Sequence, residues 1–258
     1  MAEVTLLGIA QDGGRPQPSC LMDCCKDISH DQISFPTSLG TNFQDGSKHL
    51  FDVTRNLGQQ LKLWGENDPN HVWLTHAHFG HVDGLGLFGR ETIGAKGIKL
   101  HVSSKMADLI HSTPQWSLMI EQGVFEIDMF QTGDKVQFGS ECIEPIIVPH
   151  RDELSDMHAF IVRGENHSLL YLPDHDTWEE TLDSYGCKLI RDWLDKLNID
   201  ILLVDGTFWS QHELTGRLQT EVPHPPVSQT IAHLGTRLPD DPELYFIHLN
   251  HTNPLYDK

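Results

Sequence analysis

The apolar residues of this chain occur mostly in short continuous runs that are separated by turns rich in Gly and Pro. Such runs predict strands that are buried on both faces, whereas apolar residues at every third or fourth position predict helices. The expected strands cover residues 4–10, 38–43, 49–53, 71–75, 98–102, 125–130, 135–138, 143–148, 157–162, 168–172, 199–204 and 244–247. The expected helices cover residues 55–64, 84–93, 105–111, 116–122, 185–197 and 226–234. This alternation predicts an α/β fold in which two sheets form a sandwich flanked by helices.

The length and composition are typical of one globular unit. With 258 residues, of which 38% are hydrophobic, the chain is long enough to bury a large core. The sequence contains 21 Gly and 14 Pro and shows no fixed-period repeat, linker or low-complexity segment. We therefore expect a single domain over residues 1–258.

The charge balance restricts the class of partner. Lys and Arg total 18 against 37 Asp and Glu, a formal net charge of −19, which repels nucleic acid and anionic membranes. The N-terminus lacks the basic start and long apolar stretch of a signal peptide, and no run is long enough to cross a bilayer. We therefore expect a cytoplasmic protein that acts on a small molecule and binds neither nucleic acid nor membrane. The oligomeric state stays open, with a homodimer as one option.

Three histidines directly follow the expected strand 71–75. His76, His78 and His81 place three imidazoles within six residues, and Gly80 allows the backbone to turn sharply between them. Imidazole is a preferred ligand of zinc and of other divalent transition metals. The cluster therefore predicts a metal site where the strand ends.

Other residues that can bind metals or transfer protons follow further expected strands. They are Asp52, His150, Asp174, Asp205 and His248. Because the carboxyl ends of strands in layered α/β folds gather at one crevice, we expect these side chains to meet the three histidines there. Each of them alone has the alternative interpretation of a capping or turn residue. Together they favour an enzyme.

The cysteines divide into a cluster and two isolated residues. Cys20, Cys24 and Cys25 lie close together, whereas Cys142 and Cys187 stand apart. This spacing fits metal binding in a reducing compartment better than a disulfide framework.

In their order, these motifs resemble those of the metallo-β-lactamase-fold hydrolases. That family has an Asp after an early strand, then His-x-His-x-Asp-His, a lone His, a bridging Asp and a terminal His. The corresponding positions here are Asp52, His76-x-His78-x-Gly80-His81, His150, Asp174 and His248. The segments 11–17, 203–209 and 247–254 look like those of the pyrroloquinoline-quinone biosynthesis protein B group within the family. The resemblance implies a four-layer αββα sandwich of the metallo-β-lactamase type.

The resemblance also implies the metal ligands. His76, His78 and His150 would hold a first ion, with Asp174 as a fourth ligand. Gly80 lacks the carboxylate that normally binds a second ion, for which His81, Asp174 and His248 remain and His251 is a candidate replacement. We expect one or two zinc ions, with iron and manganese as alternatives.

The resemblance also assigns catalytic roles to residues around the metals. The resemblance implies a metal-bound hydroxide as nucleophile, Asp52 as the group that orients a ligand histidine, and Asp205 with His224 as proton donor to the leaving group. The alternative interpretation makes Asp205 a helix cap and His224 a Pro-bounded helix-entry residue. Arg15, Arg90 and Arg151 are candidates for holding a substrate anion or, alternatively, partners of surface carboxylates.

Cys20, Cys24 and Cys25 resemble a structural zinc knot found in the same group, here around residues 20–30. The fourth ligand is open between His30 and a residue distant in sequence. Thiolates at the adjacent positions 24 and 25 do not easily bind the same tetrahedral zinc ion.

These observations favour a metal-dependent hydrolase of a small-molecule ester-type bond, which would be a phosphodiester, lactone or thioester. One alternative is an iron-dependent oxygenase or hydroxylase in a role like that of a cofactor-biosynthesis protein. A non-catalytic metal-binding carrier is another alternative.

Overall fold

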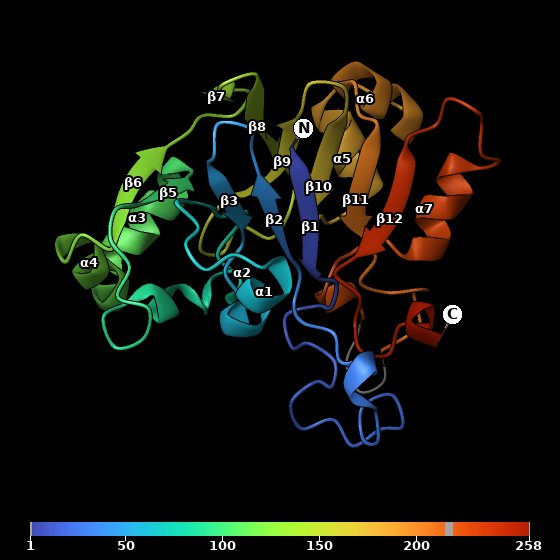
Figure 1. The fold of residues 1–258 in the computed structure, drawn as a ribbon. Helices are drawn as coiled ribbons and strands as arrows, with labels where there is room; N and C mark the ends of the chain where they lie inside the picture. The colour runs from blue at the N-terminus through green and yellow to red at the C-terminus, as the bar shows by residue number, and fades with distance from the viewer. Residues whose placement is uncertain (1, 215–218, 258) are drawn as a thin grey trace.

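The computed structural model describes residues 2–214 and 219–257, whose strands form two six-stranded sheets packed face to face (Figure 1). The first sheet has the order β1 (Glu3–Gly8), β2 (Ser38–Asn42), β3 (Lys48–Phe51), β4 (His71–Trp73), β5 (Ile98–Val102) and β6 (Phe125–Met129). The second has the order β12 (Glu243–Ile247), β11 (Ile201–Asp205), β10 (Ser168–Leu172), β9 (Met157–Arg163), β8 (Glu141–Val148) and β7 (Val136–Phe138).

Both sheets are mixed, and their parallel parts set the position of the site. Strands β3 to β6 are parallel to one another, as are β10, β11 and β12. Strand β8 runs in the same direction as β10 because both pair antiparallel with β9. The loops that follow the parallel strands of each sheet therefore leave that sheet at a single edge.

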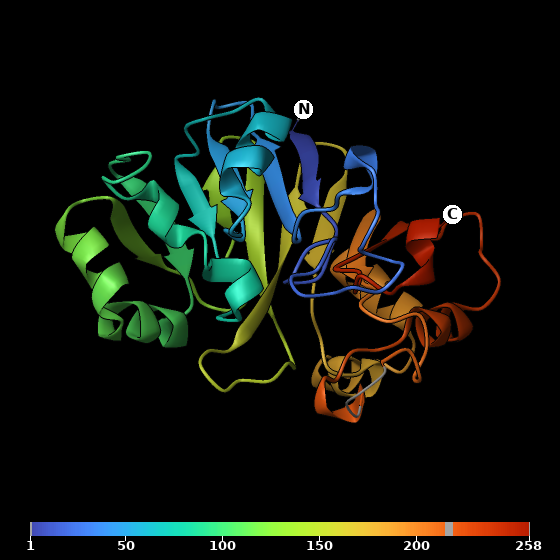
Figure 2. The ribbon, with the colours of Figure 1, turned by 90° about the horizontal axis from the view of Figure 1, so that it is seen from below.

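Helices cover the outer face of each sheet, as the view from below in Figure 2 shows. The α-helices are α1 (Leu57–Trp64), α2 (Phe79–Val82), α3 (Ser104–Ser112), α4 (Pro114–Glu121), α5 (Trp178–Ser184), α6 (Ile190–Leu197) and α7 (Val227–Leu234). Short 3₁₀ turns lie at η1 (His30–Gln32), η2 (Leu85–Phe88), η3 (Gln219–Glu221) and η4 (Pro254–Asp257). The expected four-layer αββα sandwich is confirmed.

Side chains alternate between two apolar clusters along the central strands. On β10, Leu169 and Tyr171 point into the cluster between the sheets, whereas Leu170 and Leu172 join the cluster under α5 and α6. On β3, Leu50 faces the first layer of helices and Phe51 faces the second sheet. This double burial explains why the strand sequences are continuously apolar.

Two expected helices differ from the structure. The segment 84–93 forms only the 3₁₀ turn η2, and a separate turn of helix, α2, precedes it with His78 as its N-cap and His81 in its last turn. The segment 185–197 is helical only from Ile190, because Gly186 adopts a left-handed φ of 64° after α5 has ended. Helix α5 itself begins at an N-cap, where the Thr177 side chain accepts a hydrogen bond from the Glu180 amide.

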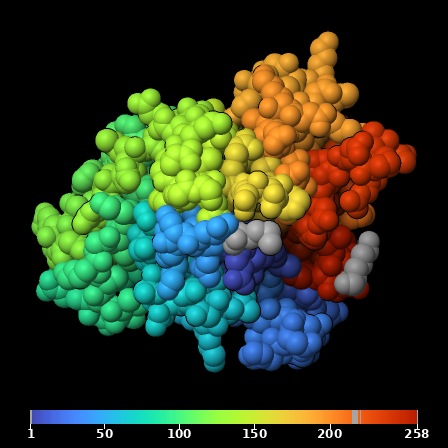
Figure 3. Space-filling model, turned by 45° about the horizontal axis from the view of Figure 1, so that its top comes forward, coloured from blue at the N-terminus to red at the C-terminus, as the bar shows by residue number. Residues whose placement is uncertain are grey.

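The segment after β1 packs against the C-terminal segment, and Figure 3 shows the blue and red surfaces in contact. Ala10 forms bridges with Pro36 and with Leu249. The amide of Gln11 donates to the Leu249 carbonyl at 2.8 Å. None of the helices in the described part of the chain is long and apolar enough to span a membrane.

Candidate metal centre

The structure brings the polar residues that follow the strands into one buried group. Asp52 follows β3, the three clustered histidines follow β4, His150 follows β8, Asp174 follows β10, Asp205 ends β11 and His248 follows β12. Asp52 and His248 have left-handed backbone φ angles of 60° and 59°, which non-glycine residues rarely adopt. The chain therefore turns sharply at both positions where it leaves its sheet.

His76, His78 and His150 form the first set of donors. The Nδ1 atom of His78 lies 2.9 Å from His76 Nε2 and 3.3 Å from His150 Nε2. His76 is buried, whereas the side chain of His78 is 21% exposed. The three nitrogens therefore converge on one point that solvent reaches past His78.

A second set of donors adjoins the first through Asp174. The Oδ2 atom of Asp174 lies 3.0 Å from His81 Nε2 and 3.6 Å from His76 Nε2, and its Oδ1 lies 3.3 Å from His248 Nδ1. Asp12 completes this set, with Oδ1 3.5 Å from His81 Nε2 and 3.4 Å from His248 Nε2. Asp174 thus lies between both sets of imidazoles.

Hydrogen bonds to buried carboxylates orient the ligand histidines. His81 donates from Nδ1 to Asp52 Oδ2 at 2.8 Å, which leaves its Nε2 lone pair facing the site. The same carboxylate accepts hydrogen bonds from the amide and hydroxyl of Thr75, and the Thr75 hydroxyl in turn accepts from His76 Nδ1 at 3.0 Å. Asp52 therefore lies behind two imidazoles and does not itself reach the donor set.

The charges of these groups fit a cation. Burial lowers the pKa of His76 well below its usual range, and burial also lowers that of His78, so both imidazoles are neutral ligands at pH 7. Burial opposes ionisation of Asp174, but His248 and His81 outweigh it and hold the pKa of Asp174 well below its usual range. Its Oδ2 is buried and has no hydrogen bond from the described residues. A buried anionic oxygen among imidazole nitrogens is a ligand set for a divalent ion.

Asp205 and His224 form a buried pair beside the donors. Nδ1 of His224 lies 2.6 Å from Asp205 Oδ2, while Asp205 Oδ1 accepts hydrogen bonds from the amide and hydroxyl of Thr207. Burial disfavours the charged imidazole, but the Asp205 carboxylate outweighs this and raises the pKa of His224. The ring centroid of His224 lies 5.6 Å from that of His150. An imidazole with a raised pKa is therefore held next to the metal ligands.

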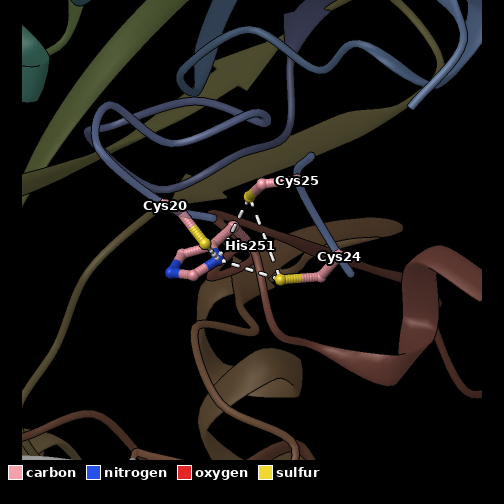
Figure 4. A group of neighbouring side chains, drawn as sticks. All are labelled: Cys20, Cys24, Cys25 and His251. Carbon is pink, nitrogen blue, oxygen red and sulfur yellow. Dashed lines mark hydrogen bonds between the residues drawn. The ribbon is translucent and has the colours of Figure 1, made fainter. Parts of the chain in front are cut away.

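The cysteine cluster gains a fourth donor from the far end of the chain (Figure 4). Nδ1 of His251 lies 3.6 Å from Cys20 Sγ, 3.3 Å from Cys24 Sγ and 3.4 Å from Cys25 Sγ. A tetrahedral zinc ion with ordinary bond lengths separates sulfur and nitrogen ligands by about 3.5 Å. The adjacent thiols at 24 and 25 reach the same point, with their sulfurs 3.9 Å apart. Three thiols and one imidazole thus have the spacing of a structural zinc site.

This arrangement corrects one expected position. We expected His251 at the second active-site ion, but the structure places its imidazole in the cysteine knot. The reason is the turn of the chain after His248, where the amide of Asn253 donates to the carbonyl of Asn250. His30, the other candidate fourth ligand, is exposed on η1.

Two carboxylates of the site were not predicted from the sequence. Asp12 lies in a Gly-rich loop far from the histidine motif, and the available signal was its place in segment 11–17, one of the three segments that carry the resemblance. Asp176 lies 2.9 Å from His150 Nδ1, and its position two residues after Asp174 was a signal. Arg15 lies at the cysteine knot, where its Nε donates to the Cys24 carbonyl and its guanidinium stacks on Tyr256.

Residues 40–249 match the family model described as Beta-lactamase superfamily domain. The chain belongs to this superfamily. Among curated proteins, the coenzyme PQQ synthesis protein B of Nitrosococcus oceani is 33% identical over 97 residues, a match that covers 34% of this chain and 31% of that protein. The match therefore spans about a third of that relative's length.

Two solved structures share the fold of almost the whole chain. Zn²⁺-bound PqqB from Methylobacterium extorquens superimposes with a TM-score of 0.75 at 16% identity, covering 99% of this chain and 91% of its own. A diphosphatase of the PhnP family gives a TM-score of 0.70 at 18% identity, covering 98% and 89%. These likenesses establish the architecture around the donor sets.

Proposed function

We propose that this protein is a metal-dependent hydrolase of an ester-type bond in a small molecule. The observation that carries the proposal is the buried pair of Asp205 and His224 beside two convergent sets of metal ligands. A metal site that only carried an ion would need no carboxylate–imidazole pair held against it. A hydrolase needs both a site that activates water and a group that protonates the departing oxygen.

The ligand residues suit this chemistry. His76, His78 and His150 would hold one ion, and Asp174, which lies beside His76 and His81, would contribute a carboxylate to the centre. A bound divalent ion supplies acidity to water and polarises a substrate oxygen. The pair of Asp52 and Thr75 keeps the imidazoles of His76 and His81 in fixed tautomers, so their lone pairs stay directed into the site.

His224 is placed to deliver the proton. Its Nδ1 donates to Asp205, which leaves Nε2 as the atom that carries a second proton when the ring is charged. Loss of that proton to a leaving alkoxide returns a neutral imidazole that Asp205 still orients. The cycle is complete when the imidazole takes a proton from the next water.

The charges at the opening of the site bear on the substrate class. A guanidinium nitrogen of Arg151 lies 3.4 Å from His78 Nε2, at the point where the site meets solvent, and Glu153 lies 3.5 Å from the same nitrogen. Arg151 is the cation that an anionic group of a small substrate would contact there. The net charge of −19 disfavours RNA or DNA as substrates. A phosphodiester fits these constraints, and a lactone or thioester with a carboxylate group fits them as well.

The direct test is the metal content of the purified protein together with hydrolysis of bis-p-nitrophenyl phosphate, a lactone panel and O₂ consumption. We expect zinc and hydrolysis that His78→Ala reduces at least 100-fold, as loss of a metal ligand requires. His233→Ala is the matched control, because His233 is exposed on α7. Iron content with O₂ consumption would instead support the oxygenase, and full metal occupancy without turnover would support the carrier.

A further inference from the structure

Gly80 and Asp12 occupy one place in the site. A Cβ atom at position 80 would lie 2.5 Å from Cγ of Asp12 and 2.7 Å from its Cα, and it would also overlap Oδ1. Both distances are well below any ordinary carbon contact. The carboxylate of Asp12 therefore fills the space in which a side chain at position 80 would begin.

The paired segments on either side of the loop fix the position of Asp12. Ile9 accepts a hydrogen bond from the Leu249 amide at 2.7 Å, and Gln11 donates to the Leu249 carbonyl at 2.8 Å. Leu249 directly follows His248, so the backbone that presents Asp12 is paired with the backbone that presents His248. The turn at Gly14, whose amide donates to the Gln11 carbonyl and whose φ is 71°, directs the chain away again.

The carboxylate of Asp12 points at two imidazole nitrogens. Its Oδ1 lies 3.5 Å from His81 Nε2 and 3.4 Å from His248 Nε2. Both nitrogens are free to bind an ion, because His81 uses Nδ1 to donate to Asp52 and His248 uses Nδ1 toward the Thr207 hydroxyl. The buried Oδ2 of Asp174, which receives no hydrogen bond from the described residues, lies 3.0 Å from the same His81 nitrogen.

We propose that Asp12 is the carboxylate ligand of a second divalent ion, which it binds together with His81 and His248, while Asp174 lies against the same His81 nitrogen. The loop after β1 thereby supplies the anionic group that position 80 cannot carry. Two imidazoles and a carboxylate are a ligand set for a zinc or manganese ion. The side chain of Asp12 is 40% exposed, so the second ion lies on the solvent side of the site.

The proposal deepens the proposed function, but metal stoichiometry tests it independently of activity. We expect three metal ions per wild-type chain, two in the active site and one in the cysteine knot. Asp12→Ala should bind two, with the affinity of the lost site reduced at least 100-fold in a cobalt titration followed by absorption. Asp27→Ala, an exposed residue of the same loop, should keep all three.

Asp12→Asn tests the proposal even if the alanine variant does not fold. The amide keeps the size and hydrogen-bonding reach of the side chain but loses its charge, so the second ion should again be lost while the melting curve stays cooperative. A double variant with Asp12→Gly and Gly80→Asp should recover part of the affinity, since it returns a carboxylate to the other loop.

Three results would overturn the proposal. They are a wild-type chain with a single active-site ion at saturating metal, an Asp12→Ala chain that keeps both, and an Asp12→Asn chain that keeps both. Loss of the second ion from Asp12→Ala in a protein without hydrolytic activity would uphold the ligand and reject only the proposed function.

Discussion

Nδ1 of His150 lies 2.9 Å from Oδ1 of Asp176, so a carboxylate two residues beyond the bridging Asp174 fixes the ring that completes the first metal set. Burial disfavours the charged carboxylate, yet His150 outweighs this and lowers the pKa of Asp176, which keeps it ionised. An ionised acceptor at Nδ1 holds the tautomer whose Nε2 faces His76 and His78.

Asp176→Asn should therefore weaken metal binding at the first site about 10- to 100-fold. The measurement is zinc affinity by competition with a chromogenic chelator. Asp183→Asn on the exposed side of α5 is the control and should match the wild type. Unchanged affinity in Asp176→Asn would mean that the carboxylate does not set the orientation of His150.

His224→Ala should lower kcat about 10²- to 10⁴-fold on esters of alkyl alcohols, because their alkoxides need a proton to depart. The loss should be much smaller on p-nitrophenyl esters, whose phenolate leaves without one. Metal content, measured alongside, should stay at the wild-type value. Equal losses on both leaving groups would identify His224 as a positioning residue.

Cys24→Ser should remove one zinc equivalent and destabilise the protein by at least about 2 kcal/mol, or roughly 4–8 °C in Tm. Burial, together with the neighbouring thiols of Cys25 and Cys20, raises the pKa of Cys24 to about 12, so its thiolate is disfavoured when no ion is bound. Metal analysis and limited proteolysis around residues 12–35 report the change. Cys142→Ser, far from the knot in sequence, should keep its zinc.

Acid should destabilise the fold through histidines remote from the proposed ion sites. Burial lowers the pKa of His49 to about 2 and that of His101 to about 3, and His101 stacks on Trp73 at 3.8 Å between ring centroids. The unfolded chain binds protons at these residues below pH 6.5 and the native chain does not. Stability is thus full above pH 6.5 and falls as pH drops, by about 1.4 kcal/mol per pH unit for each histidine.

His101→Gln should remove one of these contributions and make the decline shallower by about that amount between pH 6 and pH 4. Guanidinium unfolding of zinc-saturated protein at several pH values measures the slope. The exposed residue His233 provides the control, since His233→Gln should leave the slope unchanged. An equal slope in His101→Gln and wild type would contradict the buried-neutral assignment.

The order of apolar and polar segments was sufficient to predict the fold. Continuous apolar strands such as Leu169 to Leu172 are buried on both faces, and this pattern requires layers on either side. The segment at 185–197 was misjudged because a left-handed glycine ends a helix without disturbing the apolar spacing around it.

The expectation that polar residues at the ends of strands gather in one crevice located the histidines, Asp174 and Asp205, since each follows or ends a buried strand. It missed Asp12, which follows β1 in a loop whose path depends on pairing with Leu249, some 240 positions later. It also misplaced His251, because the direction of a side chain in a turn depends on backbone angles that residue types alone do not specify.

The donors come from both sheets, with His76, His78 and His81 after β4 and His150, Asp174 and His248 after strands of the opposite layer. Each of the two proposed ions would take ligands from both layers and so link them. Metal supply would then affect the protein's stability as well as its activity. Free ion at 100 times its Kd adds about 2.7 kcal/mol to the free energy of unfolding. When metal is scarce, the two sheets of the protein would separate more readily, and the chain would become accessible to proteases.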